Sequence, residues 1–389
     1  MESVIPNQPA PVPGDEKRTA PMPAVATKGS QRLLSLDLMR GFIMVLLTLE
    51  STRLFDHLST ASQGTVFENL MLQFDHHPWH GLRFWDLIQP GFMFIAGVAM
   101  AFSLTRQKQD GFTWSQRCRK VLKRSFWLFF WGVLDYAVRR TGLSFELWDV
   151  LTQLAFTTLV TFLVFEWRPV YHIVFCIGIL LLTELLYRGV HVPGFSEPFT
   201  DQHNFGNYMD LILMNKINKK GWVAINCLPT TVHTLIGATV GKLLLSDARH
   251  KLKTLLTGGI ISLVLGFGID ALGITPIIKR IATSSFVLAS LGWCLLTLTF
   301  FYWFIDIRKT KINPRFFLVF AMNSIFIYLF FEIVGGRWFN DYVGAITGGL
   351  LSLLNMNTTL QLICTSLSIF ALEYLMLDFL YRKKVFFKL

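Results

Sequence analysis

Three histidines within five residues are the clearest chemical signal in this sequence. His76, His77 and His80 lie in the stretch 75–82, between two long apolar segments. An unperturbed histidine has a pKa of about 6.5, so its ring can take a proton from an attacking hydroxyl or amine at neutral pH and return it later. The residues leave three alternatives open: proton transfer, which we favour, a metal site, or solvated side chains.

A metal site is the weakest of these alternatives. No zinc-type spacing such as HExxH is present around the histidines. The cysteines are scattered singly without CxxC spacing, so neither a metal centre nor a disulfide framework is indicated. They are Cys118, Cys176, Cys227, Cys294 and Cys364. We therefore expect no metal cofactor.

Carboxylates are predicted at the same membrane depth as the histidines. Glu50 and Arg53 end the first apolar segment, and Asp86 opens the second. A charged group in the hydrocarbon region costs about 3 kcal/mol or more unless it is paired or hydrated, so these residues are candidates for function. Glu50 is expected either to orient His76 or another loop histidine, or to pair with Arg53.

Further polar residues lie inside later apolar segments. Asn226 and His233 are two helical turns apart on one face, and Asn323 lies mid-segment. Each would line a polar tunnel or bond a neighbouring helix. Asp270 and Glu332 fall near outer helix ends, where solvation is easy, and are expected to carry little function.

The composition requires lipid as the main solvent. Of the 389 residues, 52% are hydrophobic and only 16% are charged. The formal net charge of +11 comes from short basic runs between apolar segments, which excludes the clustered basic face of a nucleic-acid-binding protein. Such runs instead indicate cytosolic loops.

The sequence predicts an all-α polytopic membrane protein with about ten transmembrane helices. A stretch at 343–354 is too short to span and is expected to be re-entrant or interfacial. Residues 1–31 are expected to be a disordered cytosolic tail before the membrane domain at 32–389. The ten segments are 34–55, 84–105, 121–138, 147–165, 169–187, 222–245, 254–272, 283–305, 315–334 and 358–380.

This topology places both termini in the cytosol, because the inside loops then carry about twice as many Lys and Arg residues as the outside loops. The first, second, sixth and ninth segments hold most of the polar residues at membrane depth. The third, fourth and fifth segments are expected to serve packing.

Several motifs, taken in order, resemble the heparan-alpha-glucosaminide N-acetyltransferase family and its bacterial relatives. The resemblance covers about residues 32–389. The absence of a further domain before the first segment resembles the compact bacterial form, which implies a bacterial cytoplasmic membrane. The matching residues are Leu36-Asp37 through Arg40-Gly41, His76, Trp79, Gly81-Leu82, Asp86-Leu87, Pro90, Pro276 to Lys279, Met322 to Ile325, Tyr328, Glu332 and Tyr381 to Lys384.

The resemblance implies transfer of an acetyl group from cytosolic acetyl-CoA to a glycan beyond the membrane. This reaction needs basic cytosolic groups for the CoA phosphates, a water-poor passage for the thioester and an outward base. The family's catalytic histidine falls on His76. The expected roles are catalysis for His76, Glu50 and Asp86, donor binding for Arg40, Asn323 and Lys279, and acceptor binding for His77, Trp79, His80, Asn226 and His233.

Three departures from the family pattern leave the acceptor open as a sugar amine or hydroxyl. Glu50-Ser51 stands where the family commonly has an asparagine. The family's Asp-Pro-Glu-Gly run is here Asn218-Lys219-Lys220-Gly221, and Phe331 replaces a histidine. The alternative function is a proton-coupled transporter or glycan flippase on the same scaffold. The expected partners are the lipid bilayer, a glycan acceptor and a second copy in a homodimer, with no nucleic acid.

Overall fold

The computed structural model describes residues 33–139 and 142–387, and their regular structure is helical. Within these ranges, the single β-type pairing is an isolated antiparallel bridge between His80 and Ile278. The predicted all-α class is confirmed. The tail predicted at 1–31 lies outside the described residues.

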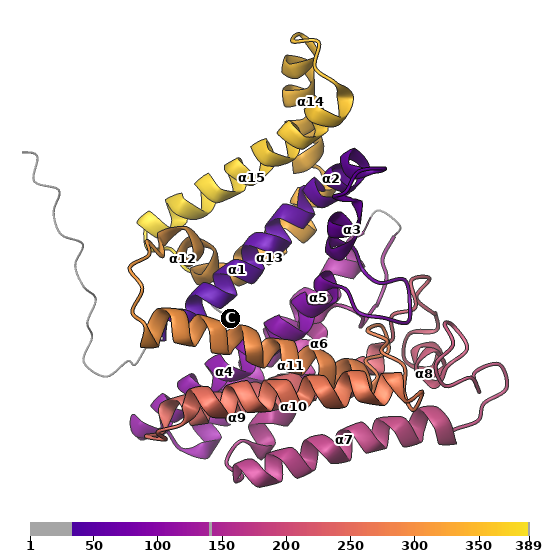
Figure 1. Ribbon diagram of the computed structural model, residues 1–389, viewed down its shortest axis with the longest axis vertical. Coiled ribbons are helices and arrows are strands. Elements are labelled where there is room, and N and C mark those ends of the chain that lie inside the picture. Colours follow the sequence, from indigo (N-terminus) through magenta and orange to yellow (C-terminus); the bar gives the residue numbers. More distant parts are fainter. Residues whose placement is uncertain (1–32, 140–141, 388–389) are drawn as a thin grey trace, which may run out of the picture. The chain divides into compact units, whose positions relative to one another are not determined.

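The helices of the described ranges include long membrane-type helices and short loop helices (Figure 1). Three short segments continue or precede long helices: η2 (Phe84–Leu87), η3 (Ala224–Asn226) and the π-helical η4 (Tyr302–Ile307). The α-helices are α1 (Leu34–Ser51), α2 (Leu54–Ser62), α3 (Glu68–Met71), α4 (Ile88–Gln109), α5 (Trp114–Ala137), α6 (Val150–Val164), α7 (Pro169–Gly189), α8 (Phe205–Met214), α9 (Cys227–Leu245), α10 (Lys251–Ala271), α11 (Ser284–Phe301), α12 (Arg315–Met322), α13 (Ser324–Ile333), α14 (Phe339–Ser352) and α15 (Thr358–Arg382).

Several helices are long and apolar enough to cross a bilayer, which makes the chain a multi-pass membrane protein. The other predicted segments are helical too, but they are shorter or more polar. The total of ten crossings therefore stays a prediction. The five helices that meet both conditions in the described residues are Phe84–Gln109, Pro169–Gly189, Lys251–Ala271, Ser284–Ile307 and Thr358–Arg382.

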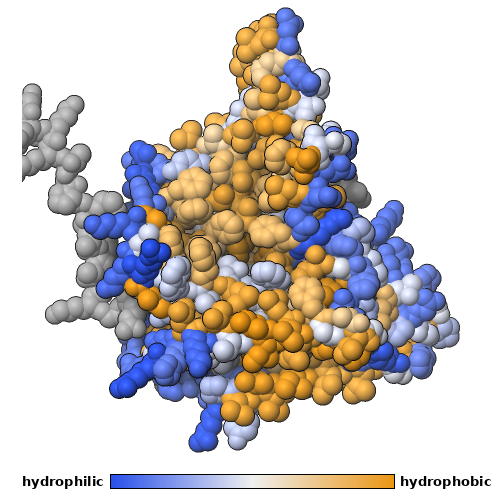
Figure 2. Space-filling model, in the orientation of Figure 1, coloured by the Kyte–Doolittle hydropathy of each residue, from blue (hydrophilic) through white to orange (hydrophobic). Residues whose placement is uncertain are grey.

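The molecular surface agrees with a lipid environment. Figure 2 shows apolar residues between hydrophilic residues at two opposite ends of the visible face. Helix α10 exposes large apolar side chains along its length, including Ile261 and Val264, and only 17% of its most apolar window is buried. Soluble monomers rarely expose such continuous apolar surface, so lipid tails are its natural solvent.

The segment predicted as one helix at 315–334 is broken, and that prediction was wrong. Helices α12 and α13 meet at Asn323 with a bend of 70°. The side-chain amide of Asn323 donates to the carbonyl of Val385 at 3.1 Å and accepts from the backbone N–H of Phe387 at 3.0 Å. Asparagine side chains compete with helical backbone bonds in this way. The amide predicted to bind the donor therefore holds the C-terminal segment.

The short segment predicted near 343–354 forms helix α14. Its 14 residues rise about 21 Å, less than the roughly 30 Å of a hydrocarbon core. It packs against α15, where the hydroxyls of Thr347 and Thr365 are 2.8 Å apart.

Close packing of α4 against α9 fixes the helix that carries Asp86 at its start. A Cβ added at Gly97 would overlap the carbonyl oxygen of Thr234, and one at Gly237 would overlap that of Phe94. Small residues at such contacts let two membrane helices approach closely. The start of α4 is thereby held against the rest of the bundle.

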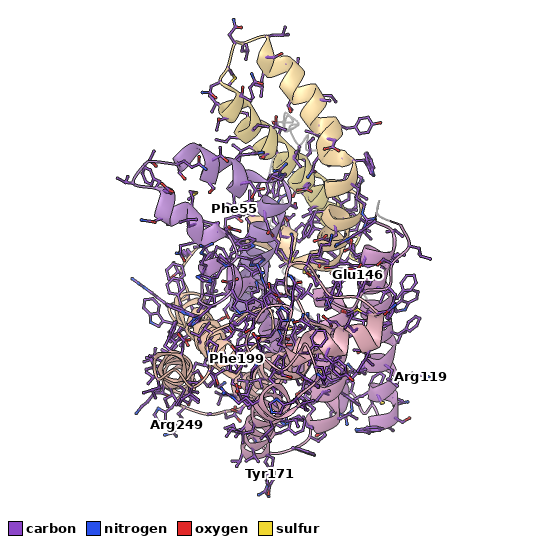
Figure 3. All side chains as sticks on the ribbon, turned by 90° about the vertical axis from the view of Figure 1, so that its right-hand side faces the viewer. Phe55, Arg119, Glu146, Tyr171, Phe199 and Arg249 are labelled. Carbon is purple, nitrogen blue, oxygen red and sulfur yellow. The ribbon has the colours of Figure 1, made fainter. Side chains whose placement is uncertain are left out.

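Loops from distant parts of the sequence meet at one end of the bundle, which we call the histidine end. Trp79 donates its indole N–H to the carbonyl of Phe199 at 2.7 Å, and the N–H of Gly81 donates to Ile277 at 2.8 Å. Figure 3 looks onto this end, where Phe55, Glu146 and Phe199 belong to three separate segments.

Other loops meet at the opposite end, which we call the basic end. The ammonium of Lys108 lies 2.9 Å from the carboxylate of Glu166, which also pairs with Arg117 at 2.7 Å. The start of α1 joins the end of η4 through Ser35 and Asp306. The bundle therefore has two polar ends joined by apolar helices.

Candidate active site

His76, Asp86 and Lys279 form a compact cluster at the histidine end. The Nδ1 atom of His76 is 3.0 Å from Oδ1 of Asp86 and 3.1 Å from Nζ of Lys279. The lysine and the carboxylate are 3.6 Å apart, and both side chains are almost completely buried. Three residues from two distant loops thus share one small polar site.

The hydrogen bonds of Asp86 determine which imidazole nitrogen is available for chemistry. Oδ2 accepts from the backbone N–H groups of Arg83 at 2.9 Å and His77 at 3.3 Å. An ionised carboxylate only accepts, so we assign the tautomer in which Nδ1 of His76 donates to Oδ1. In this tautomer Nδ1 cannot accept from the nearby Lys279 ammonium, which pairs with Asp86 instead. Nε2 is then the unprotonated nitrogen that can act as a base.

The local sequence explains why Asp86 is held in place. The Asp86 carboxylate caps the start of η2, because it accepts from the backbone N–H of Arg83 three residues before it. The His80–Ile278 bridge and the bond from Gly81 to Ile277 join the histidine loop to the loop that carries Lys279. Backbone pairing therefore positions the lysine beside the imidazole.

Burial and charge keep the imidazole of the cluster in its neutral, reactive form. Burial lowers the pKa of His76, and the ammonium of Lys279 lowers it further, against the opposing effect of Asp86. Burial also lowers the pKa of Lys279 to about 8, although Asp86 favours its charged form. The imidazole is therefore uncharged at neutral pH, as a general base must be.

His76 and Lys279 face a cavity of about 710 Å³. The indole of Trp222 packs edge-on against the His76 ring, with ring centres 5.9 Å apart. The lining residues are Leu47, Glu50, Asp75, His76, Pro78, Trp85, Ile88, Gln89, Phe92, Asp135, Tyr136, Arg139, Trp148, Asp149, Val150, Lys220, Trp222, Lys279, Arg280, Tyr328, Phe331 and Glu332.

Both predicted partners of Glu50 were wrong. Glu50 lines the cavity and accepts a hydrogen bond from the indole N–H of Trp85 at 2.9 Å. Arg53 pairs instead with Asp56 at 3.2 Å, because a left-handed backbone at Arg53 ends the helix before it. Asp86 is the carboxylate that orients His76.

Helices α5, α6 and α13 supply a second polar wall, so the prediction that α5 and α6 serve only packing was wrong. The hydroxyl of Tyr328 donates to Asp149 at 2.9 Å, and the same carboxylate caps α6. Arg139 stacks on Tyr136 at 3.6 Å. Glu332, which was expected to be merely solvated, also lines the cavity.

Arg337 holds this second wall together. Its guanidinium pairs with Asp135 at 2.9 Å and donates to the carbonyl of Glu332 at 3.0 Å. Arg139 binds the other oxygen of Asp135 at 3.0 Å. The ends of α5 and α13 are therefore fixed relative to each other. Charged residues within the predicted segments 121–138 and 147–165 were the signal that could have revealed this wall.

The five predicted acceptor-binding residues are not among the described residues that line the cavity. His80 pairs with Asp270 at 2.7 Å, and the His77 ring packs against Gly81. Asn226 donates to the carbonyl of Arg280, and the buried His233 contacts the hydroxyl of Ser290. With the indole of Trp79 bonded to Phe199, these residues support the walls of the site.

Arg40 lies away from the cavity, toward the basic end. It is ten residues before Glu50 on α1, which corresponds to about 15 Å. Arg40 lies close enough to Arg124 for the two positive charges to repel each other. Arg124, Lys120 and Lys123 line a separate pocket of about 340 Å³ between α4 and α5. Positive charge is therefore gathered at the end opposite His76.

Comparison with known proteins supplies the family. The model of the heparan-alpha-glucosaminide N-acetyltransferase catalytic domain matches residues 32–277, which is more than half of the chain. The chain belongs to this acetyltransferase family. No curated protein matches the sequence. The family match includes His76 and Asp86 but ends just before Lys279, so the third member of the cluster is assigned by the geometry of this chain.

Metal ligation is a separate question. Within residues 33–139 and 142–387, no group of three or more His, Cys, Asp or Glu residues is arranged to hold a metal ion. Asp86 pairs with His76, and Asp270 pairs with His80.

Proposed function

We propose that this protein transfers an acetyl group from acetyl-CoA to a sugar amine or hydroxyl, with His76 as the general base. One observation carries the proposal: a neutral imidazole, oriented by Asp86, faces a large cavity in a chain of an acetyltransferase family. The Asp86–His76 pair is the arrangement that activates an acceptor proton in other acyl-transfer enzymes.

The proposed acetyl transfer uses His76 as the base and Lys279 as a nearby positive charge. Nε2 of His76 takes a proton from the acceptor as its nitrogen or oxygen attacks the thioester carbonyl. The bond from the carbonyl carbon to sulfur then breaks, and the imidazolium returns its proton to the departing CoA thiolate. Lys279, beside His76, offers a positive charge for the carbonyl oxygen as it becomes negative. Acetylation of His76 before transfer uses the same ring and stays a second route.

The two ends of the bundle support a donor that enters from the cytosol. The basic end carries Arg40 and Arg124, which suit the CoA phosphates, while His76 lies at the other end. In this arrangement the chain crosses the membrane ten times, both termini are cytosolic and the acceptor arrives from outside. The hydrophilic ends and apolar middle of Figure 2 support this placement.

The second wall of the cavity suits a sugar. Asp149, Glu332 and Tyr328 are acceptors and donors for hydroxyl or amino groups, and Trp148 and Trp222 offer flat apolar faces. Glu50, in place of the family asparagine, places a further carboxylate there. The cavity thus joins a base to a polar acceptor site.

Turnover by purified protein in detergent tests the proposal. With radiolabelled acetyl-CoA and methyl α-glucosaminide, we expect acetylated sugar and one free CoA for each acetyl group transferred. No membrane gradient is needed, because the chemistry is complete within one cavity. If the purified, folded protein transports the sugar in sealed vesicles but releases no CoA in detergent, the enzyme proposal is wrong.

Replacing Lys279 by methionine is expected to shift the acidic limb of the pH profile of kcat/KM upward by about one pH unit. The Lys279 ammonium lowers the pKa of His76, so its removal raises that pKa. A base must be neutral, so activity is then lost at a higher pH as the solution is acidified. Lys279→Arg keeps the charge and should leave the limb near its original position. A downward shift in Lys279→Met would contradict this assignment.

A further inference from the structure

An apolar groove of about 440 Å³ runs along the bundle beside the catalytic cavity. It extends over about two turns of both α5 and α6, roughly 10 Å along each helix. Helix α8 and the start of α9 close it at the histidine end. The lining residues are Leu122, Ser125, Phe126, Phe129, Leu147, Thr152, Gln153, Ala155, Phe156, Leu159, Leu213, Ala224, Ile225 and Cys227.

The groove and the cavity are two sides of one wall. Leu147 lines the groove, and the next residue, Trp148, lines the cavity. The same change occurs at a second position in the wall, where Trp222 lines the cavity and Ala224 lines the groove. The groove and the cavity therefore have lining residues that are one and two positions apart in the sequence.

Buried hydrogen bonds hold this wall together. Asp210 accepts from the indole N–H of Trp148 at 3.1 Å and from the backbone N–H of Ala224 at 2.8 Å. Gln153 in the groove wall bonds Gln89 in the cavity wall at 2.6 Å. The alignment of groove and cavity is thus built into the folded chain.

The groove opens toward lipid. Large apolar side chains along it are partly exposed, including Phe126 at 60%, Leu122 at 52% and Leu213 at 45%. In a membrane protein such side chains contact hydrocarbon. The groove is therefore entered sideways from the bilayer, whereas a water-soluble acceptor would have no use for it.

Basic residues line the cavity next to residues of this wall. Lys220 is two residues from Trp222, and Arg139, which pairs with Asp135, stacks on Tyr136 beside Trp148. Lys220 belongs to the run 218–221, which holds two lysines. This charge is complementary to an anionic group such as a phosphate.

We propose that the acceptor is a lipid-linked sugar whose hydrocarbon chain lies in the groove, whose anionic link lies near Lys220 and Arg139, and whose sugar reaches the cavity. This inference rests on the proposed function and names the acceptor class. The reaction is unchanged: a sugar amine or hydroxyl displaces CoA from the thioester.

Alkyl α-glucosaminides test the groove in nanodiscs of fixed lipid composition. The native protein should prefer a dodecyl over a methyl glycoside in kcat/KM. Leu213→Trp and Leu159→Trp fill the groove, so each should lower the dodecyl-to-methyl ratio by about tenfold. Leu181→Trp, on the lipid-facing surface of α7, is the matched control and should keep the native ratio. An unchanged ratio in both groove variants would overturn the proposal.

Photocrosslinking tests occupancy without turnover. An alkyl α-glucosaminide with a diazirine at the chain terminus should label peptides from α5, α6 and α8, and Leu213→Trp should reduce this labelling severalfold. Equal labelling of α7 and α10 would show bulk lipid contact only and overturn the inference. If the native protein transfers acetyl groups to no acceptor while groove labelling persists, the proposed reaction fails but the lipid site stands.

Discussion

Replacing His76 by alanine is expected to lower the rate of acetyl transfer by about 10²–10⁴-fold, the usual contribution of a general base. The imidazole is the group that Asp86 orients toward the cavity, and its pKa is lowered by burial and by Lys279. CoA release from acetyl-CoA in detergent, with methyl α-glucosaminide as acceptor, measures the effect. Thermal unfolding of the variant should stay close to that of the native protein.

His80→Ala is the matched control for this substitution. His80 comes from the same loop, but it is exposed, pairs with Asp270 and is not among the described residues that line the cavity. Its loss should change the rate by less than about fivefold. If His76→Ala retains full activity while His80→Ala does not, the assignment of the base is wrong.

Replacing Asp86 by asparagine is expected to lower kcat by about 10³–10⁴-fold with little change in KM. An asparagine amide can donate to Nδ1 and so favour the wrong imidazole tautomer, as substitution of the orienting carboxylate does in serine proteases. The buried Lys279 also loses its ion-pair partner. Single-turnover rates with saturating acetyl-CoA separate this effect from weaker substrate binding.

Two comparisons make the Asp86 result specific. Asp270→Asn removes the carboxylate that pairs with His80 and should leave kcat within a few fold of the native value. Asp86→Asn added to His76→Ala should cost almost nothing more, because residues that act as one unit are not additive. Additive losses would show that Asp86 acts separately from His76.

The helical class and the first two members of the catalytic cluster could be predicted from the sequence. Apolar segments of about 20 residues require helices in lipid, because each backbone N–H and C=O must find a partner within the segment. His76 and Asp86 are ten residues apart at the start of one such segment, so their proximity follows from local structure. The exact helix break at Asn323 did not follow, because it depends on bonds to residues 385 and 387.

The second wall of the cavity was not predicted from the sequence. Asp149 is on α6, whereas Tyr328 and Glu332 are on α13, and these residues line one cavity only because the fold brings the two helices together. Their depth in predicted helices was visible in the sequence, but the direction in which each side chain points was not. Glu50 shows the same limit, since its partner Trp85 is 35 residues away.

By itself, the sequence determined that this chain is embedded in a membrane and that its helices are long and apolar. It also determined that a loop histidine beside a carboxylate is the best candidate for the base. These features depend on composition and short-range spacing. The tertiary structure decided that Lys279, 203 residues from His76, completes the cluster, that α5 and α6 help form the cavity, and that an apolar groove adjoins it. These features depend on which helix faces meet, and that is settled by long-range packing and buried hydrogen bonds.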